Sequence, residues 1–146
     1  MQKSNEQDII KLTSILKYLN YIKDCFEKHN INNSNTLKND FIAQAACTQF
    51  ITNIYENKNK LQDETYDKLV ELNKIKLAGA RHIASHDYDS LEFRAIFAIC
   101  KQLTITIIFE EINNVLSELS KIEEEQEADE QSEEESKEVI QNADND

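Results

Sequence analysis

Apolar residues recur every three or four positions along most of the chain. From Asp8 to about Lys28 the repeat includes Leu12 and Leu19, and this spacing places such residues on one face of a helix. The same period predicts a second helix from Asp40 to about Leu61 and a third from Asp63 to about Ala84. Three amphipathic helices are therefore expected in this part of the chain.

A fourth helix is expected from about Leu91 to about Lys121. The stretch from Leu103 to Phe109 is dense in β-branched residues, but the helical period continues through it and no turn signal bounds it. Polar residues between the helices predict a loop at Asn30 to Asn39 and a break at Ser85 to Asp89. We therefore expect an all-α fold, arranged as an antiparallel four-helix up-and-down bundle.

The composition supports this fold class by excluding others. The chain of 146 residues has no proline and one glycine, so it lacks the turn residues of sandwiches and barrels and the glycine-rich loops that bind phosphates. Its longest apolar runs are much shorter than a membrane span, and its polar start does not resemble a secretory signal. We expect one helical domain over residues 1–121, without a membrane partner.

The net charge of −12 is concentrated at the C-terminal end. Residues 118–146 hold 13 acidic and 2 basic side chains, whereas residues 1–117 hold 15 acidic and 14 basic ones. A segment so acidic and so poor in apolar residues is typical of disorder, which predicts a disordered acidic tail over residues 122–146. The remaining body is nearly neutral, so its overall charge does not strongly repel nucleic acid.

Three cysteines, Cys25, Cys47 and Cys100, lie far apart in the sequence and form no CxxC pair. An odd number of scattered cysteines indicates reduced thiols in a cytoplasmic protein. All three lie among apolar residues, so we interpret them as small buried hydrophobic residues.

The candidate chemistry lies between the third and fourth predicted helices. This stretch contains Arg81 and His86, and the single glycine, Gly79, just precedes it. A histidine can transfer a proton near neutral pH, and a guanidinium can hold a phosphate with two hydrogen bonds. The pair therefore suits cleavage of a phosphodiester in RNA, where the 2′-hydroxyl serves as the nucleophile. Residues five apart do not share a helix face, so the pair can converge only at a helix break or between two copies.

These residues resemble a motif of a known family. Arg81-x4-His86-x-Tyr88 is similar to the RX4HXY motif of HepT-type toxins in the HEPN superfamily, which are helical ribonucleases paired with a minimal nucleotidyltransferase antitoxin. His82 stands where that family most often has asparagine. Glu56 matches the family's Gly-Glu-Ala near the end of the second helix, although its neighbours differ. The resemblance covers about residues 6–120.

The resemblance implies a homodimer with both motifs at a shared cleft, metal-independent cleavage of an RNA substrate (tRNA or mRNA) and no cofactor. Arg81 and His86 are implied as the catalytic residues, and His82, Glu56 and Asp87 as supporting ones. It further implies that the antitoxin silences the toxin by attaching AMP to Tyr88, which adds bulk and negative charge where an RNA phosphate binds.

Other interpretations stay open at this point. Arg81 and His86 could form a helix-end ion pair or cap with Asp87 or Asp89. The i,i+4 pair His82 and His86 could hold a metal, although a zinc site of the HExxH type needs a glutamate where Ile83 stands. The chain could also be a non-catalytic helical bundle that binds a nucleotidyltransferase partner or acts as a scaffold.

Overall fold

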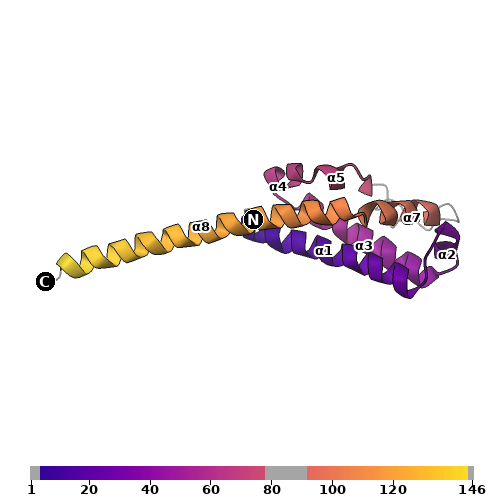
Figure 1. Ribbon diagram of the computed structural model, residues 1–146, viewed down its shortest axis with the longest axis horizontal. Coiled ribbons are helices and arrows are strands. Elements are labelled where there is room, and N and C mark those ends of the chain that lie inside the picture. The colour runs from indigo at the N-terminus through magenta and orange to yellow at the C-terminus, as the bar shows by residue number, and fades with distance from the viewer. Residues whose placement is uncertain (1–3, 78–91, 145–146) are drawn as a thin grey trace.

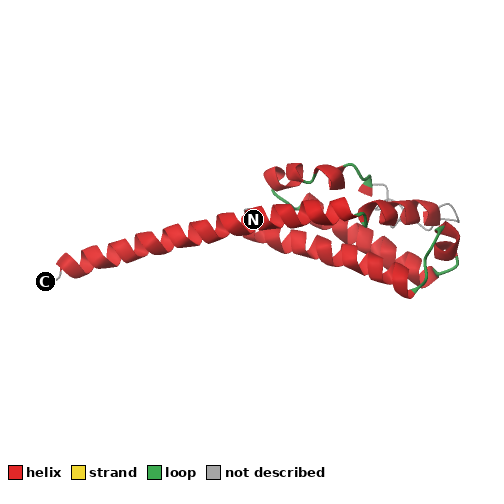
Figure 2. Ribbon diagram, viewed as in Figure 1, coloured by secondary structure: helices red, strands yellow, loops and turns green. Residues whose placement is uncertain are grey.

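The computed structural model describes residues 4–77 and 92–144 (Figure 1). These residues form seven helices, and the described ranges contain no strand (Figure 2). The expected all-α fold class is therefore confirmed for this part of the chain. None of the helices there is long and apolar enough to cross a membrane.

Helices α1 (Asn5–Lys28) and α3 (Phe41–Asn59) are close to their expected ranges and pack against each other. Each begins at a short polar side chain that accepts a hydrogen bond from a free amide of the first turn, as is typical of helix N-caps. Ser4 caps α1, and Asp40 caps α3 by accepting from the Ala43 amide at 3.0 Å. The two helices run antiparallel, because the start of α1 contacts the chain that leaves α3.

The connection between these helices contains an element that the sequence did not predict. Helix α2 (Ser34–Lys38) occupies the middle of the expected loop. A capping box explains why so polar a segment is helical: the Asn33 side chain accepts from the Thr36 amide, and the Thr36 hydroxyl accepts from the Asn33 amide. The fully buried Leu37 anchors this helix to the core.

The expected third helix is wrong as a continuous element. Up to Leu77, where the described residues end, it is replaced by two short helices, α4 (Asp63–Lys68) and α5 (Val70–Asn73). Leu69 separates them with a non-helical ψ of 59°. Two features favour the break. The side chains of Leu69 and Leu72 are both fully buried, and the Glu111 carboxylate accepts hydrogen bonds from two backbone amides at the start of α5. Periodicity alone contains no information about that distant carboxylate.

The expected fourth helix is also divided. Helix α7 (Glu92–Leu103) ends where Thr104 begins a turn, and α8 (Thr106–Asp144) follows almost in line with it (Figure 1). The Thr104 hydroxyl donates to the Cys100 carbonyl at 2.8 Å. Such back-bonding is a known cause of helix bending, and the break falls inside the β-branched stretch that made this region ambiguous.

Apolar side chains from all the packed helices form one core. Helix α1 contacts α3 and α8, α7 contacts α2 and α3, and α5 contacts α8. Rings also pair across helices, since Phe26 on α1 stacks on Phe97 of α7 with centroids 5.7 Å apart. The fully buried leucines and isoleucines of α1 and α3 are Leu12, Ile15, Leu19, Ile22, Ile51 and Ile54.

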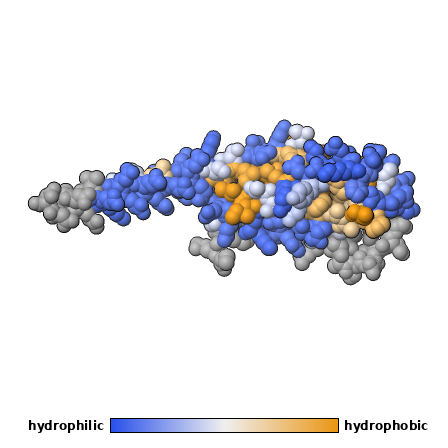
Figure 3. All heavy atoms as spheres, turned by 90° about the horizontal axis from the view of Figure 1, so that it is seen from below, coloured by the Kyte–Doolittle hydropathy of each residue, from blue (hydrophilic) through white to orange (hydrophobic). Residues whose placement is uncertain are grey.

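The acidic C-terminal segment differs from the expected disorder, because α8 continues through it to Asp144. The helix crosses residues 121 and 122 without interruption and projects beyond the body (Figure 1). Residues 124–138 are all exposed, and hydrophilic side chains cover this projection (Figure 3). Its composition explains the helix: the segment is rich in glutamate and glutamine, which have good helix propensity, and has no proline or glycine.

Candidate functional site

Most of the predicted site lies between α5 and α7. Residues 78–91, which contain the proposed catalytic pair, are outside the described part of the chain. The predicted site residues in that segment are Arg81, His82, His86, Asp87 and Tyr88. Their roles, including the metal-binding alternative for the histidine pair, stay predictions.

Glu56 is the predicted site residue that the structure describes. It lies in the last turn but one of α3, and its side chain is exposed to solvent. The described residues do not bring it to another predicted site residue. Its assignment as a supporting residue therefore stays a prediction as well.

The residues that flank the predicted site are held in the core. On the N-terminal side Leu77 is 2% exposed, and on the C-terminal side Phe93, at the start of α7, is 5% exposed. Burial of these two side chains fixes where the chain leaves the body and where it returns.

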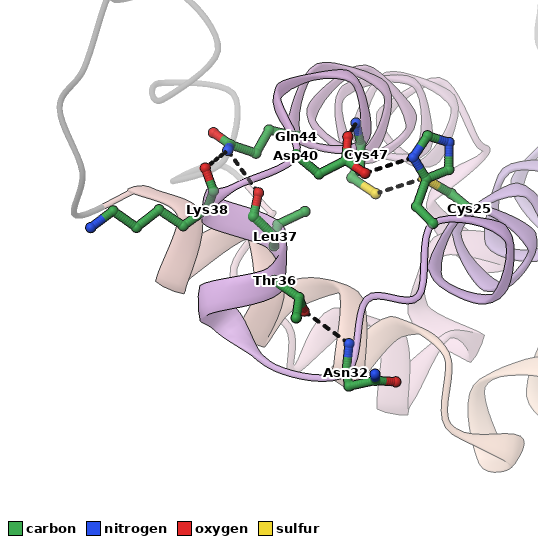
Figure 4. A network of polar contacts seen from close by, with 10 residues as sticks. Cys25, Asn32, Thr36, Leu37, Lys38, Asp40, Gln44 and Cys47 are labelled. Carbon is green, nitrogen blue, oxygen red and sulfur yellow. Dashed lines mark hydrogen bonds and ion pairs between the residues drawn. The ribbon is translucent and has the colours of Figure 1, made fainter.

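Two cations lie beside the point where α7 begins. The Lys38 Nζ and the Arg94 Cζ are each 5.6 Å from the centroid of the Phe93 ring. Both side chains belong to exposed residues, and Figure 4 shows Lys38 extending away from the neighbouring polar contacts. Arg94 closely follows the motif in the sequence. Lys38 is distant in sequence, and only the packing of α2 against α7 brings it to the same ring.

The groove between α4, α5 and α8 has the opposite charge. Glu71, Glu110, Glu111 and Glu118 line it, with Lys68 as the cation among its described lining residues. That lysine is already paired with Glu118 at 3.3 Å. The groove therefore repels phosphate and is not suited to bind RNA.

A histidine–carboxylate pair joins the end of α1 to the start of α3. The Nδ1 of His29 lies 2.7 Å from Oδ2 of Asp40, the residue that also caps α3. The hydrogen bond from the Ala43 amide, and then that from His29, lower the pKa of the Asp40 carboxyl. The α2 connection sets this pairing, because it leads from the end of α1 to the start of α3.

The thiols of all three cysteines are free and converge in the same region. Cys47 and Cys100 are fully buried, as expected, whereas Cys25 is partly exposed. The Cys47 Sγ lies 3.9 Å from that of Cys25 (Figure 4), and a hydrogen bond with Cys100 and burial raise the pKa of the Cys47 thiol. Burial raises the pKa of Cys25 to about 12. Cys25 is therefore protonated at neutral pH and is poorly suited to nucleophilic catalysis.

A buried carboxylate near the start of α1 was missed by the sequence analysis. Asp8 is fully buried, and it accepts hydrogen bonds from the backbone and side chain of Gln62 at 3.2 and 2.9 Å and from the Thr65 hydroxyl. All its partners lie where the chain passes from α3 into α4. These contacts give Asp8 a structural role at that connection, because they already satisfy the buried oxygens.

Within the described ranges, no group of three or more histidine, cysteine or acidic side chains is arranged to hold a metal ion. Comparisons of the chain with protein-family models, with curated proteins and with solved structures find no match.

Proposed function

We propose that the chain is an endoribonuclease toxin that cleaves RNA without a metal ion. The observation that carries this proposal is the spacing Arg81-x4-His86-x-Tyr88 in a segment between two helical parts of the chain. His86 acts as the general acid or base, because histidine is the residue type that most often transfers protons in catalysis. Arg81 binds the scissile phosphate and stabilises the charge that develops on it.

The neighbouring residues take regulatory and supporting roles in this proposal. Tyr88 is the acceptor of AMP from a nucleotidyltransferase antitoxin, and the added phosphate repels the RNA backbone. His82, Glu56 and Asp87 support the catalytic pair. The assembly is a homodimer with both motifs at one cleft, which provides a way for Arg81 and His86 to converge.

Three features of the described residues support the proposal. The chain there is helical, the segment with the motif is flanked by the buried residues Leu77 and Phe93, and Lys38 and Arg94 supply positive charge next to its C-terminal end. Lysine and arginine near a cleavage site favour binding of the RNA phosphates.

We further infer a four-helix, up-and-down arrangement for residues 1–121. In this arrangement α1, α3 and the α7–α8 pair supply three of the four positions, and the short helices α4 and α5 lie at the fourth, in place of one continuous helix. Residues 124–138 of α8 are all exposed, and a lone helix without tertiary packing is marginally stable in water. We therefore infer that residues 122–144 exchange between helix and disordered conformations.

The test is cleavage of RNA in the presence of EDTA by the purified chain, after mass spectrometry has shown that Tyr88 is unmodified. We expect the wild-type chain to cut RNA and leave a 2′,3′-cyclic phosphate, because the 2′-hydroxyl attacks. We expect His86→Ala and Arg81→Ala each to lower the rate at least about 100-fold.

His29→Ala is the matched control, because it removes the histidine that lies outside the motif and is paired with Asp40. It is expected to cleave at the wild-type rate. Equal cleavage by the wild type and His86→Ala, or no cleavage by an unmodified wild-type chain, contradicts the proposal.

The alternative is a non-catalytic helical bundle that binds a nucleotidyltransferase or acts as a scaffold. The observation that favours it is the long projection of α8, whose exposed acidic side chains offer a surface for a partner. This alternative predicts a stable complex with a nucleotidyltransferase, no cleavage of RNA, and no effect of His86→Ala on the affinity of the complex.

A further inference from the structure

The three cysteines of the chain meet where α1, α3 and α7 pack together, although they lie far apart in the sequence. Cys47 on α3 donates a hydrogen bond to the Sγ of Cys25 on α1 at 3.9 Å, and the interaction with Cys100 on α7 raises the pKa of the Cys47 thiol. Figure 4 shows the Cys25 and Cys47 side chains pointing toward each other. The pair thus bridges two helices that the core already holds side by side.

Access from solvent distinguishes these thiols. Cys25 is partly exposed, whereas Cys47 and Cys100 are both 0% exposed. A small reagent therefore reaches the Cys25 sulfur first, and the Cys47 sulfur lies directly behind it. An accessible thiol beside a second thiol permits a two-step oxidation, in which a sulfenic acid on the first condenses with the second to a disulfide.

We propose that Cys25 and Cys47 form a modification site whose substrate is a peroxide and whose product is a disulfide between α1 and α3. In the first step the Cys25 thiolate attacks one peroxide oxygen. The O–O bond breaks, Cys25 becomes a sulfenic acid, and the departing hydroxide takes up a proton to form water. In the second step the Cys47 sulfur attacks the Cys25 sulfur, and the S–O bond breaks as the S–S bond forms. The hydroxyl leaves as a second water with the Cys47 proton, so two thiols are oxidised and one peroxide is reduced.

The bond requires a shorter sulfur–sulfur distance than the 3.9 Å of the folded chain. A disulfide needs a sulfur–sulfur distance of about 2.05 Å, so the two atoms must approach by about 2 Å. The proposal requires that rotation of the two side chains supplies this movement while α1 and α3 stay packed. Because little thiolate is present at neutral pH, the reaction is slow there and becomes faster as the pH rises. The disulfide therefore forms during prolonged oxidation rather than during brief exposure to a peroxide. Its formation does not depend on the proposed ribonuclease function.

The test exposes the native full chain to millimolar hydrogen peroxide at pH 8.5 for several hours. Remaining thiols are then blocked with N-ethylmaleimide under denaturing conditions. Lysines or arginines lie between the three cysteines in the sequence, so trypsin separates them into different peptides. We expect the Cys25 and Cys47 peptides to be joined, with the mass of two hydrogens lost, and Cys100 to be alkylated. Treatment with dithiothreitol should restore three alkylated cysteines.

Cys100→Ser is the matched control and should keep the linkage, whereas Cys47→Ser should lose it and retain a Cys25 sulfenic acid that dimedone labels. If Cys47→Ser does not fold, Cys47→Ala takes its place. The peptide map of the wild-type chain still shows whether Cys25 and Cys47 are linked. A link through Cys100, links only between chains, or three alkylated cysteines after the full exposure overturns the proposal.

Discussion

The Nδ1 of His29, at the end of α1, lies 2.7 Å from Oδ2 of Asp40, at the start of α3. Asp40 also accepts the amide of Ala43, so one carboxylate both begins a helix and joins it to its neighbour. A histidine that donates to a carboxylate favours the charged form of the acid. The stability that this contact supplies should therefore depend on pH.

The first prediction concerns Asp40→Asn, which keeps an N-cap side chain but removes the charge. The pKa of Asp40 is lowered in the folded chain from its ordinary value of 3.8. The stabilisation is therefore complete above that value and is lost as the pH falls through the lower folded pKa. Urea unfolding from pH 3 to 6 should show the wild type more stable than Asp40→Asn at pH 6, with the difference shrinking toward pH 3. A difference independent of pH contradicts this assignment.

The second prediction concerns the buried Asp8. Asp8→Ala removes the acceptor of the partly buried Gln62 amide and of the buried Thr65 hydroxyl, while the Gln62 side chain keeps its bond to Asn5. Unpaired buried donors are costly, so the free energy of unfolding should fall by about 3 kcal/mol. Glu6→Ala, an exposed acidic residue of the same helical turn, is the control and should change it by less than about 1 kcal/mol. Similar losses in both variants contradict the buried network.

The third prediction tests the break between α4 and α5. The Glu111 carboxylate on α8 accepts from the amides of Glu71 and Leu72 at 2.9 and 3.1 Å. Glu111→Ala should lower the free energy of unfolding by about 1–2 kcal/mol, and Glu111→Gln by less, because glutamine keeps one acceptor oxygen. Glu110→Ala, the exposed neighbour, should stay within about 0.5 kcal/mol of the wild type. Equal effects at Glu110 and Glu111 contradict the capping role.

These contacts show which parts of the fold the sequence can predict. The period of apolar residues and the caps are local, so α1 and α3 were predicted to within a few residues, with Asp40 at the expected start. The division of the third helix depends on Glu111, a residue distant in sequence, and no local pattern contains that information. Helix α2 was missed because its capping box, rather than an apolar face, stabilises it.

The candidate site likewise has features that the sequence predicts and features that only the folded chain shows. The motif from Arg81 to Tyr88 is local and was found from residue types and spacing alone. Two other features depend on how the helices pack: the position of Lys38 beside Phe93 and the convergence of Cys25 with Cys47. Local patterns in the sequence do not show that packing.

The fourth prediction concerns the projecting part of α8. Ending the chain after Glu123 removes a segment whose residues 124–138 are all exposed. Because the side chains described in this segment are exposed, its loss should change the thermal midpoint by less than about 2 °C. The helical signal in circular dichroism should fall by less than a full helix of that length contributes, since a lone helix is only partly populated. Leu119→Ala, a buried residue of the same helix, is the destabilising control.

The last prediction joins this truncation to the proposed function. Removing residues 124–146 deletes 11 acidic and 1 basic side chains, so the net charge of the chain changes from −12 to −2. Less repulsion of the RNA backbone should raise the affinity for RNA at low salt, and the gain should vanish above about 0.5 M salt because charges are then screened. Binding of a labelled RNA to the His86→Ala chain, with and without the tail, measures this without cleavage. A gain that persists at high salt would indicate that the tail blocks the site by direct contact instead.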